Sequence, residues 1–221
     1  MEADISARHL SFLETGRSVP SREMVLHLAE HLAIPLRERN ALLMAAGYAP
    51  VFPERNLDDP ALAAARKAVD LVLQAHEPYP AIAIDRHWTL VAANAAVGAF
   101  MHVEDESLLQ PPVNVLRASL HPRGIAPRIA NLGEWRAHVL DRVRRQIDAS
   151  GDPVLIALLE ELRSYPAPPP RTTHDYGGIV VPIELKTEQG ICAFFSTTTI
   201  FGTPVDVTLS ELAIEAFFPA K

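Results

Sequence analysis

The chain has 221 residues, a formal net charge of −7 and a hydrophobic content of 48%. This length allows one large or two modest domains, and the composition excludes a wholly disordered chain. The acidic balance excludes a protein that simply coats nucleic acid, and the single cysteine, Cys192, excludes an internal disulfide. Since no apolar run reaches the length of a membrane span, we expect a cytoplasmic protein.

The N-terminal stretch predicts a short helix with a signal at each end. Ser6 is placed to cap the first turn, and Ile5 and Leu10 have the spacing of a hydrophobic staple. Gly16 supplies the left-handed residue that ends such a helix. The helix then presents polar and basic side chains on the side away from Leu10 and Leu13.

Two further helices are predicted in the next thirty or so residues. Ser21 caps the second helix, and Pro35 is placed as the first residue of the third, which stops at Gly47. The second helix carries an apolar stripe at helical spacing, which consists of Val25, Leu28, Ala29 and Leu32. Residues 1–47 therefore predict a small all-α unit, and the proline-rich residues 48–60 predict a semi-rigid linker.

The pattern then changes between helix and strand. Residues 61–77 predict a helix, and alternating apolar residues predict strands at 81–84 and 88–92, joined by the turn Asp85-Arg86-His87. Asn94 follows as the cap of the next helix, which we favour over a ligand contact because asparagine is a preferred N-cap.

The rest of the chain predicts helices followed by a hairpin. Asn131 caps a long helix, and Asp152-Pro153 opens another. The long helix has four arginines that we expect on its solvated face, Arg136, Arg142, Arg144 and Arg145. Residues 179–200 predict a long antiparallel hairpin, and 205–218 close the domain. We therefore predict an α+β protein in which the small all-α unit precedes a domain, residues 61–221, with an antiparallel sheet packed with helices.

No catalytic pattern emerges from the sequence. It lacks a Gly-rich phosphate loop, HExxH, G-x-S-x-G and paired CxxC motifs. His27 and His31 lie four residues apart, but no third metal ligand is evident near them. We therefore expect no enzyme, no catalytic residue, no metal site and no cofactor.

Three stretches carry a resemblance to a known family. They are SARHLSFLETGRSVPSREMVLHLAEHLAIPLRERNALLMAAGYAP, AIAIDRHWTLVAANAAVGAF and FGTPVDVTLSELAIEAFFPA. In this order they resemble XRE/Cro-type helix-turn-helix transcriptional regulators with an MmyB-like, PAS-like ligand-binding domain. The resemblance implies a DNA-reading helix within residues 6–21. It also implies two earlier helices, so we expect a partial, N-terminally truncated helix-turn-helix domain at residues 1–47.

The resemblance points to candidate DNA contacts on and beside the first helix. The residues expected to face bases are Ala7, Arg8, His9, Ser11 and Phe12, and those expected to contact phosphates are Arg17, Ser18 and Arg22. Residues 1–50 hold five arginines and six acidic residues, so they lack the usual basic footprint. A sensor or dimerisation module that does not bind DNA is the alternative.

A PAS-like sheet curls around an apolar interior, which predicts a small-ligand pocket. The candidate apolar lining consists of Trp88, Phe100, Met101, Leu116, Trp135, Phe194, Phe195 and Phe201, and the candidate polar anchors are Asn114, His121 and Arg123. Each of these can equally be an ordinary core or surface residue. The resemblance implies a fatty-acid-like or other small apolar ligand, whose carboxylate an Arg or His could bind. We expect a homodimer in which ligand shifts the two DNA-reading heads, with operator DNA as partner.

Overall fold

The computed structural model describes residues 7–170 and 181–220, except for the side chains of Ala7, His9 and Leu10. The chain forms two compact units. The first consists of Met1–Ala63 with Phe201–Glu211, and the second of Ala64–Ile200 with Leu212–Lys221. N-terminal helices precede an antiparallel sheet packed with helices, which confirms the predicted α+β class.

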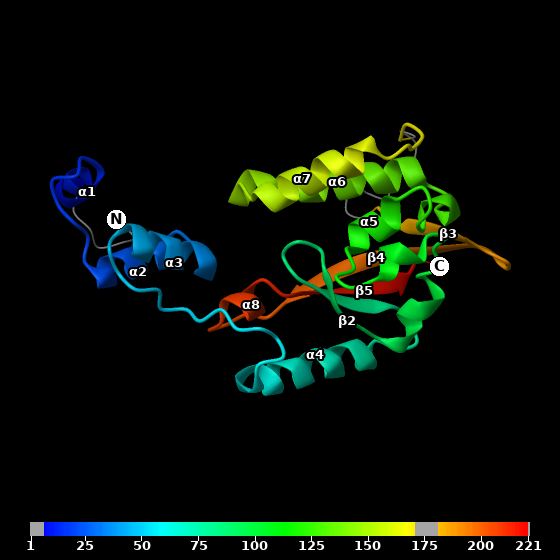
Figure 1. Cartoon of the computed structure of the whole chain (residues 1–221), viewed down its shortest axis with the longest axis horizontal. Coiled ribbons are helices and arrows are strands. Elements are labelled where there is room, and N and C mark those ends of the chain that lie inside the picture. The colour runs from blue at the N-terminus through cyan, green and yellow to red at the C-terminus, as the bar shows by residue number, and fades with distance from the viewer. Residues whose placement is uncertain (1–6, 171–180, 221) are drawn as a thin grey trace. The chain divides into compact units, whose positions relative to one another are not determined.

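The first unit is helical (Figure 1). Its helices are α1 (Ala7–Glu14), α2 (Arg22–His31), α3 (Leu36–Ala45) and α8 (Val207–Ser210). Ser21 caps α2 as predicted, because its Oγ accepts a hydrogen bond from the Met24 N–H at 3.2 Å. Gly16, at φ +68°, ends α1 as predicted. The predicted cap and staple at residues 5 and 6 lie outside the described residues.

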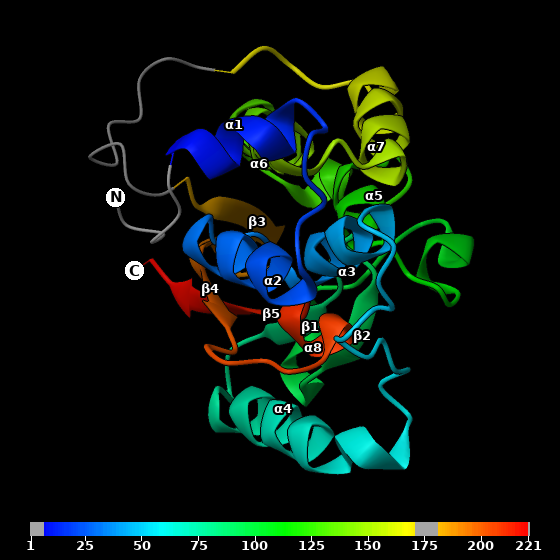
Figure 2. The ribbon, with the colours of Figure 1, turned by 90° about the vertical axis from the view of Figure 1, so that its left-hand side faces the viewer.

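The apolar stripe predicted for α2 is only partly buried. Val25 and Ala29 are buried, but Leu32 is 69% exposed because α2 ends at His31 and no longer places the next residue on its inner face. α2 and α3 lie side by side, and Leu43 of α3 is fully buried (Figure 2). Three helices of this length thus bury few apolar side chains.

Residues 48–60, predicted as a linker, are held in the first unit by specific hydrogen bonds. The Asn40 side chain accepts from the backbone N–H of Val51 and Phe52 and donates to the Phe52 carbonyl at 2.7 Å. Farther along, the Pro53 carbonyl accepts from the Val207 N–H at 2.9 Å. This part of the chain is therefore fixed rather than free.

The segment Phe201–Glu211 is a chain excursion between two strands of the second unit, yet it groups with the first unit. Asp206, which is 1% exposed, forms an ion pair with Arg55 at 3.1 Å. The Thr208 hydroxyl donates to the Arg55 carbonyl at 2.6 Å. The sequence pattern predicts this segment as part of the ligand domain. It does not reveal the grouping with the first unit, because the partners of Asp206 and Thr208 lie some 150 residues away. The predicted domain boundaries stay predictions.

The second unit is built on a sheet that, within the described residues, has five antiparallel strands in the order β2-β1-β5-β4-β3. The strands are β1 (Ala81–Ile84), β2 (Leu90–Ala93), β3 (Ile183–Thr187), β4 (Gly190–Ile200) and β5 (Ala213–Pro219). The hairpin of β3 and β4 is confirmed over residues 183–200, whereas residues 179 and 180 lie outside the described residues.

Helices flank this sheet on both sides. The α-helices are α4 (Ala63–Ala75), α5 (Val115–Leu120), α6 (Leu132–Ser150) and α7 (Pro153–Ser164). Figures 1 and 2 show α4 on one side of the sheet and α6 and α7 on the other. The main core forms between the sheet and α5–α7, where Leu120, Val143 and Leu162 are almost fully buried. Amphipathic helices laid on one sheet face thus enclose the apolar interior.

Two predicted helix caps are wrong in their side-chain role. Asn94 and Asn131 precede helices, but neither side chain caps one. The Asn94 amide instead donates to the Leu73 and Tyr79 carbonyls and accepts from the Ala81 N–H. Asn131 likewise bonds backbone groups of residues 182 and 184. Both side chains are buried, where they supply hydrogen-bond partners to backbone groups of distant parts of the chain.

Candidate ligand cavity

The second unit encloses an apolar cavity of about 100 Å³ between the sheet and the helices α5 and α6. Its lining consists of Pro80, Ile82, Trp88, Val97, Phe100, Met101, Val115, Leu116, Ser119, Ile125, Trp135, Val139, Arg142, Ile183, Leu185, Glu215 and Phe217. Cavities lined mainly by apolar side chains with a few polar groups hold small ligands. The cavity therefore suits a compact and largely apolar molecule.

Five of the predicted ligand residues line this cavity. They are Trp88, Phe100, Met101, Leu116 and Trp135. The Trp135 indole N–H donates to the Ser119 hydroxyl at 3.0 Å, which fixes the ring in the wall. The structure thus brings these side chains together, while their ligand contacts stay a prediction.

Three predicted aromatic residues lie elsewhere. Phe194 packs edge to face on Phe100, with ring centroids 5.0 Å apart, and so supports the wall from behind. Phe195 stacks on Phe218 at 5.4 Å, and Phe201 belongs to the first unit. Alternation along β4 separates Phe194 from its neighbour, because successive side chains of a strand point to opposite faces.

The three predicted polar anchors do not line the cavity. Asn114 caps α5 by accepting from the Arg117 N–H at 3.0 Å. The His121 ring packs edge to face on Tyr165 at 5.1 Å. Arg123 forms an ion pair with Asp105 at 3.1 Å. Each side chain therefore has a local structural partner.

Two charged residues that line the cavity, Arg142 and Glu215, form an ion pair that the sequence pattern does not predict. Arg142 of α6 bonds Glu215 of β5 through Nη2, and Glu215 is 3% exposed. The same Nη2 donates to the Thr198 hydroxyl at 3.3 Å. The guanidinium also lies 4.7 Å from the centroid of the Trp88 ring, within cation–π distance. The prediction that Arg142 faces solvent is therefore wrong.

The helical spacing of α6 indicates that Arg142 faces the interior. It lies three residues after the buried Val139 and seven after Trp135, so a helix places all three on one face. Arg136 is also not simply solvated, since its Nη2 donates to the Arg163 carbonyl at the end of α7 at 2.6 Å. Arg144 is exposed as predicted.

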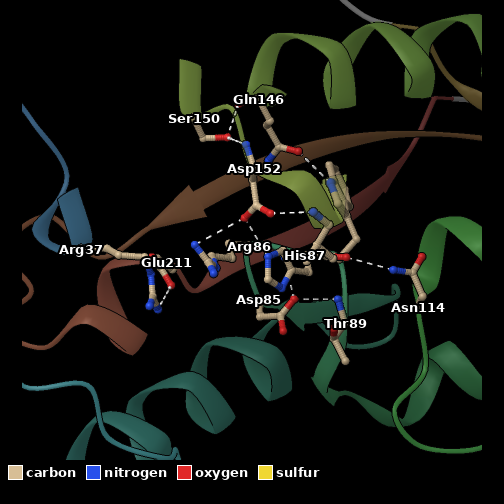
Figure 3. Close-up of polar contacts among 12 residues, drawn as sticks. Arg37, Asp85, Arg86, His87, Thr89, Asn114, Gln146, Ser150, Asp152 and Glu211 are labelled. Carbon is tan, nitrogen blue, oxygen red and sulfur yellow. Dashed lines mark hydrogen bonds and ion pairs between the residues drawn. The ribbon is translucent and has the colours of Figure 1, made fainter. Parts of the chain in front are cut away.

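A tight turn presents Trp88 to the cavity. Asp85 accepts from the backbone N–H of His87 and Thr89, each at 2.8 Å (Figure 3). Trp88 lies in this turn at φ +66°, not in the strand predicted for it, and its indole N–H donates to Gln146 at 2.8 Å. A non-glycine residue at positive φ costs about 1–2 kcal/mol, which the hydrogen bonds and the burial of the ring offset.

Asp152 ties this turn to α7. It caps the helix by accepting from the Val154 N–H at 2.8 Å, and it bonds His87 Nε2 at 2.9 Å and Arg86 at 3.4 Å (Figure 3). Burial raises the pKa of Asp152, but the hydrogen bonds from His87 and Val154 and the nearby positive charges lower it more. The net pKa of Asp152 lies below its ordinary value.

We expect the Asp152→Asn variant to lose about 1–2 kcal/mol of unfolding free energy at pH 7, because asparagine still caps α7 but lacks the charge. The pKa of this acid is lower in the folded than in the unfolded state. Its stabilisation is therefore present above the unfolded pKa and is lost as pH falls through the folded pKa. Urea denaturation should show a smaller difference from the native protein at pH 3 than at pH 7, while the exposed Asp148→Asn control changes little. An equal loss at both pH values contradicts this account.

The predicted DNA contacts all lie in the first unit, on α1 or between it and the start of α2. Arg8, Arg17 and Arg22 are exposed, and the Arg8 guanidinium lies 5.5 Å from the centroid of the Phe12 ring. Ser11 is exposed and Ser18 half-buried, while Ala7 and His9 belong to α1.

The two remaining arginines of this region are engaged within the first unit. Arg37 bonds Glu211 at 2.7 Å and also pairs with Glu54, and its hydrogen bonds to these acids raise its pKa above the ordinary value (Figure 3). Arg39 donates to the Ile34 carbonyl at 2.6 Å. Exposed positive charge is therefore concentrated at Arg8, Arg17 and Arg22.

Among the described residues, no group of three or more His, Cys, Asp or Glu side chains is arranged to hold a metal ion. His27 and His31 contact each other, with ring centroids 4.4 Å apart. Within the part of the chain that the structure describes, no helix combines the length and apolarity that a membrane span needs.

An apolar cavity enclosed by an antiparallel sheet and helices, with a buried ion pair in its wall, is the architecture of a small-molecule-binding domain. Residues 65–221 match the family described as MmyB-like transcription regulator ligand binding domain, and the chain belongs to this family. The match spans nearly all of the second unit together with residues 201–211. A comparison with curated proteins finds no match.

Proposed function

We propose that this chain is a ligand-responsive transcription regulator that binds operator DNA through α1 and senses a small apolar molecule in the cavity of the second unit. The observation that carries the proposal is the enclosed apolar cavity in a domain that belongs to a regulator family. In this proposal the cavity binds a ligand and does not catalyse a reaction. A fatty-acid-like molecule is one ligand candidate, because the cavity wall is apolar apart from a few polar groups.

The exposed arginines support the DNA-binding half of this proposal. Arg8 lies within α1, and Arg17 and Arg22 flank the turn that follows it. Phosphate contacts position a protein on DNA, whereas side chains on the inserted face of a helix read base edges. Arg8 is thus suited to a base and Arg17 to a phosphate.

Chain connectivity supports a route from ligand to DNA. Glu215 and Thr198 pair across β5 and β4, and the chain between these strands runs through Phe201–Glu211 of the first unit. A ligand shifts an equilibrium only by its different affinities for two states. If ligand binds more tightly to one arrangement of β4 and β5, it can therefore shift the conformational equilibrium of the first unit. In a homodimer it would shift both DNA-binding units.

Replacement of Arg8 and Arg17 by alanine tests the DNA-binding role. We expect Arg8→Ala to weaken binding to a duplex selected from a random pool roughly tenfold but to change binding to a scrambled duplex little. Arg17→Ala should weaken both and reduce the salt dependence, because it removes a phosphate contact. Fluorescence anisotropy at several salt concentrations measures this, with Arg144→Ala in the second unit as control. Unchanged affinity in both variants removes the assignment.

A sensor or dimerisation module without DNA binding is the second candidate. The near balance of charge in residues 1–50 favours it, as do exposed apolar side chains of the first unit such as Val19, Leu32 and Met44. Sedimentation analysis combined with duplex titration distinguishes the two candidates. A stable dimer that binds no duplex even at low salt supports the second.

A further inference from the structure

We propose that a second pocket of the second unit, between α6 and β4, binds a phosphate group, either free or carried by a small molecule. The pocket is open to solvent and has a volume of about 380 Å³. Its lining consists of His138, Arg142, Arg145, Gln146, Val181, Ser196 and Thr198. We call it the α6–β4 pocket. It shares only Arg142 with the apolar cavity, so it is a site beyond the proposed function.

One face of α6 supplies the basic side chains of the pocket. His138, Arg142 and Arg145 are four and three residues apart, so the helix places them on the same side. The side chain of Arg145 pairs with Asp141 at 2.8 Å, but both side chains are more than 60% exposed. An exposed pair of this kind is weak, so the guanidinium of Arg145 is available to an anion.

The pocket is rich in hydrogen-bond donors. Gln146 uses its Oε1 to accept from the Trp88 indole N–H at 2.8 Å, which leaves its NH₂ group as a donor. Among the described residues, none accepts from the Ser196 hydroxyl, and none accepts from Nε or Nη1 of Arg142. These groups come from a helix on one side of the pocket and a strand on the other.

The same pocket is poor in acceptors. No acidic residue is part of its described lining. The Thr198 hydroxyl already accepts from Arg142 and donates to Glu215, each at 3.3 Å. A phosphate presents acceptor oxygens in several directions, and its bonds to arginine are charge-assisted. It therefore matches donors on two sides better than a planar carboxylate with two oxygens.

The pKa of His138 indicates the sign of the electrostatic potential in the pocket. Burial lowers this pKa, and the positive charges of Arg142 and Arg145 lower it further. The negative charges of Glu215 and Asp141 raise the pKa of His138, but by less. The pocket is therefore electropositive despite the two nearby acids, which favours an anionic ligand.

The volume of the pocket leaves room for more than a phosphate ion. At roughly 30 Å³ for each water-sized group, a five-atom phosphate fills less than half of it. A small phosphomonoester such as glycerol 3-phosphate therefore fits as well as inorganic phosphate does. These two molecules are the probes, and acetate is the comparison for a carboxylate.

Isothermal titration calorimetry of the full chain at constant ionic strength tests the site. We expect saturable binding of at least one phosphate probe with a dissociation constant below roughly 10 mM. Acetate should bind roughly tenfold more weakly or not at all. The probe that binds more tightly identifies the source of the phosphate group. Absence of saturable binding by both phosphates, or acetate binding of equal strength, overturns the proposal.

Two neighbouring arginines of α6 provide a matched pair of variants. Arg145→Gln should weaken phosphate binding roughly tenfold, because it removes a charge-assisted partner. Arg144→Gln removes the same charge from an exposed position outside the pocket, and it should change the affinity less than about twofold. Equal losses in the two variants, or no loss in Arg145→Gln, overturn the assigned site.

Two neighbouring residues of β4 provide a second pair. Ser196→Ala removes a hydroxyl donor from the pocket and should weaken phosphate binding roughly threefold. Thr197→Ala should not, because successive side chains of a strand point to opposite faces of the sheet. Unchanged binding in Ser196→Ala overturns the role of β4 in the site.

Nuclear magnetic resonance of the His138 ring locates the bound anion. A phosphate in the pocket offsets the positive charges of Arg142 and Arg145, so the pKa of His138 should be higher in phosphate than in chloride of equal ionic strength. An unchanged pKa of His138, at phosphate concentrations that saturate binding in calorimetry, places the anion elsewhere and overturns the proposal.

Discussion

Replacement of Arg142 by methionine is expected to lower the unfolding free energy of the chain by about 3 kcal/mol. Methionine keeps much of the volume of the side chain but removes the cation. Glu215, which is 3% exposed, then keeps only the Thr198 hydroxyl as a side-chain partner among the described residues. Loss of one member of a buried ion pair is costly because the other charge stays desolvated. Urea denaturation followed by circular dichroism measures the change.

Two variants control for this effect. Arg144→Met removes an exposed cation from the same helix and should change stability by less than about 0.5 kcal/mol. The double variant Arg142→Met/Glu215→Met removes both charges and should recover most of the lost stability, since apolar replacements of buried pairs are often neutral. A cost of less than about 1 kcal/mol for Arg142→Met contradicts the importance of this pair.

Replacement of Asn94 by alanine is expected to cost about 3 kcal/mol. The buried Asn94 side chain donates to the Leu73 and Tyr79 carbonyls and accepts from the Ala81 N–H, at 2.8–3.1 Å. It therefore connects the end of α4 to the start of β1. Alanine removes this partner from all three backbone groups in an environment that water reaches poorly, and among the described residues only the Leu73 carbonyl keeps another hydrogen bond, from the His76 N–H at 3.3 Å. Buried backbone groups that lose a partner are expensive.

Thermal and urea unfolding test this expectation. Gln74→Ala, which truncates an exposed amide on α4, serves as the control and should have little effect. If Asn94 acted mainly as the N-cap that its sequence position indicates, Asn94→Ser would retain nearly full stability, because serine is also a preferred cap. A loss with serine close to that with alanine supports the tertiary role.

Local signals in the sequence predict much of the fold. Gly16 and Ser21 mark helix ends through backbone geometry and side-chain hydrogen bonds that involve only their near neighbours. Asp152 caps α7 for the same reason. The alternation along residues 183–200 and the helical spacing of Trp135 and Val139 also concern residues close together in the chain.

Features that depend on distant partners could not be predicted in this way. Glu215 is 73 residues from Arg142 in the sequence, and neither position alone shows that the two charges are buried together. Asparagine at position 94 is a preferred capping residue at a capping position, but its side chain bonds backbone groups of Leu73, Tyr79 and Ala81 instead. The burial of Arg142, unlike its pairing with Glu215, could have been predicted, because its spacing from Val139 places it on the buried face of the helix.

Because Phe201–Glu211 belongs to the first unit, the two units are not consecutive segments of the chain. A cut after residue 63 would leave the helical piece without Val207 and the other piece with Asp206 separated from Arg55. Each fragment would then contain residues of the first unit whose partners are on the other fragment. A chimera that exchanges the first unit of this protein with that of a relative must therefore include both segments of sequence. A fragment of residues 65–221 retains α8 but lacks the rest of the first unit, against which α8 packs.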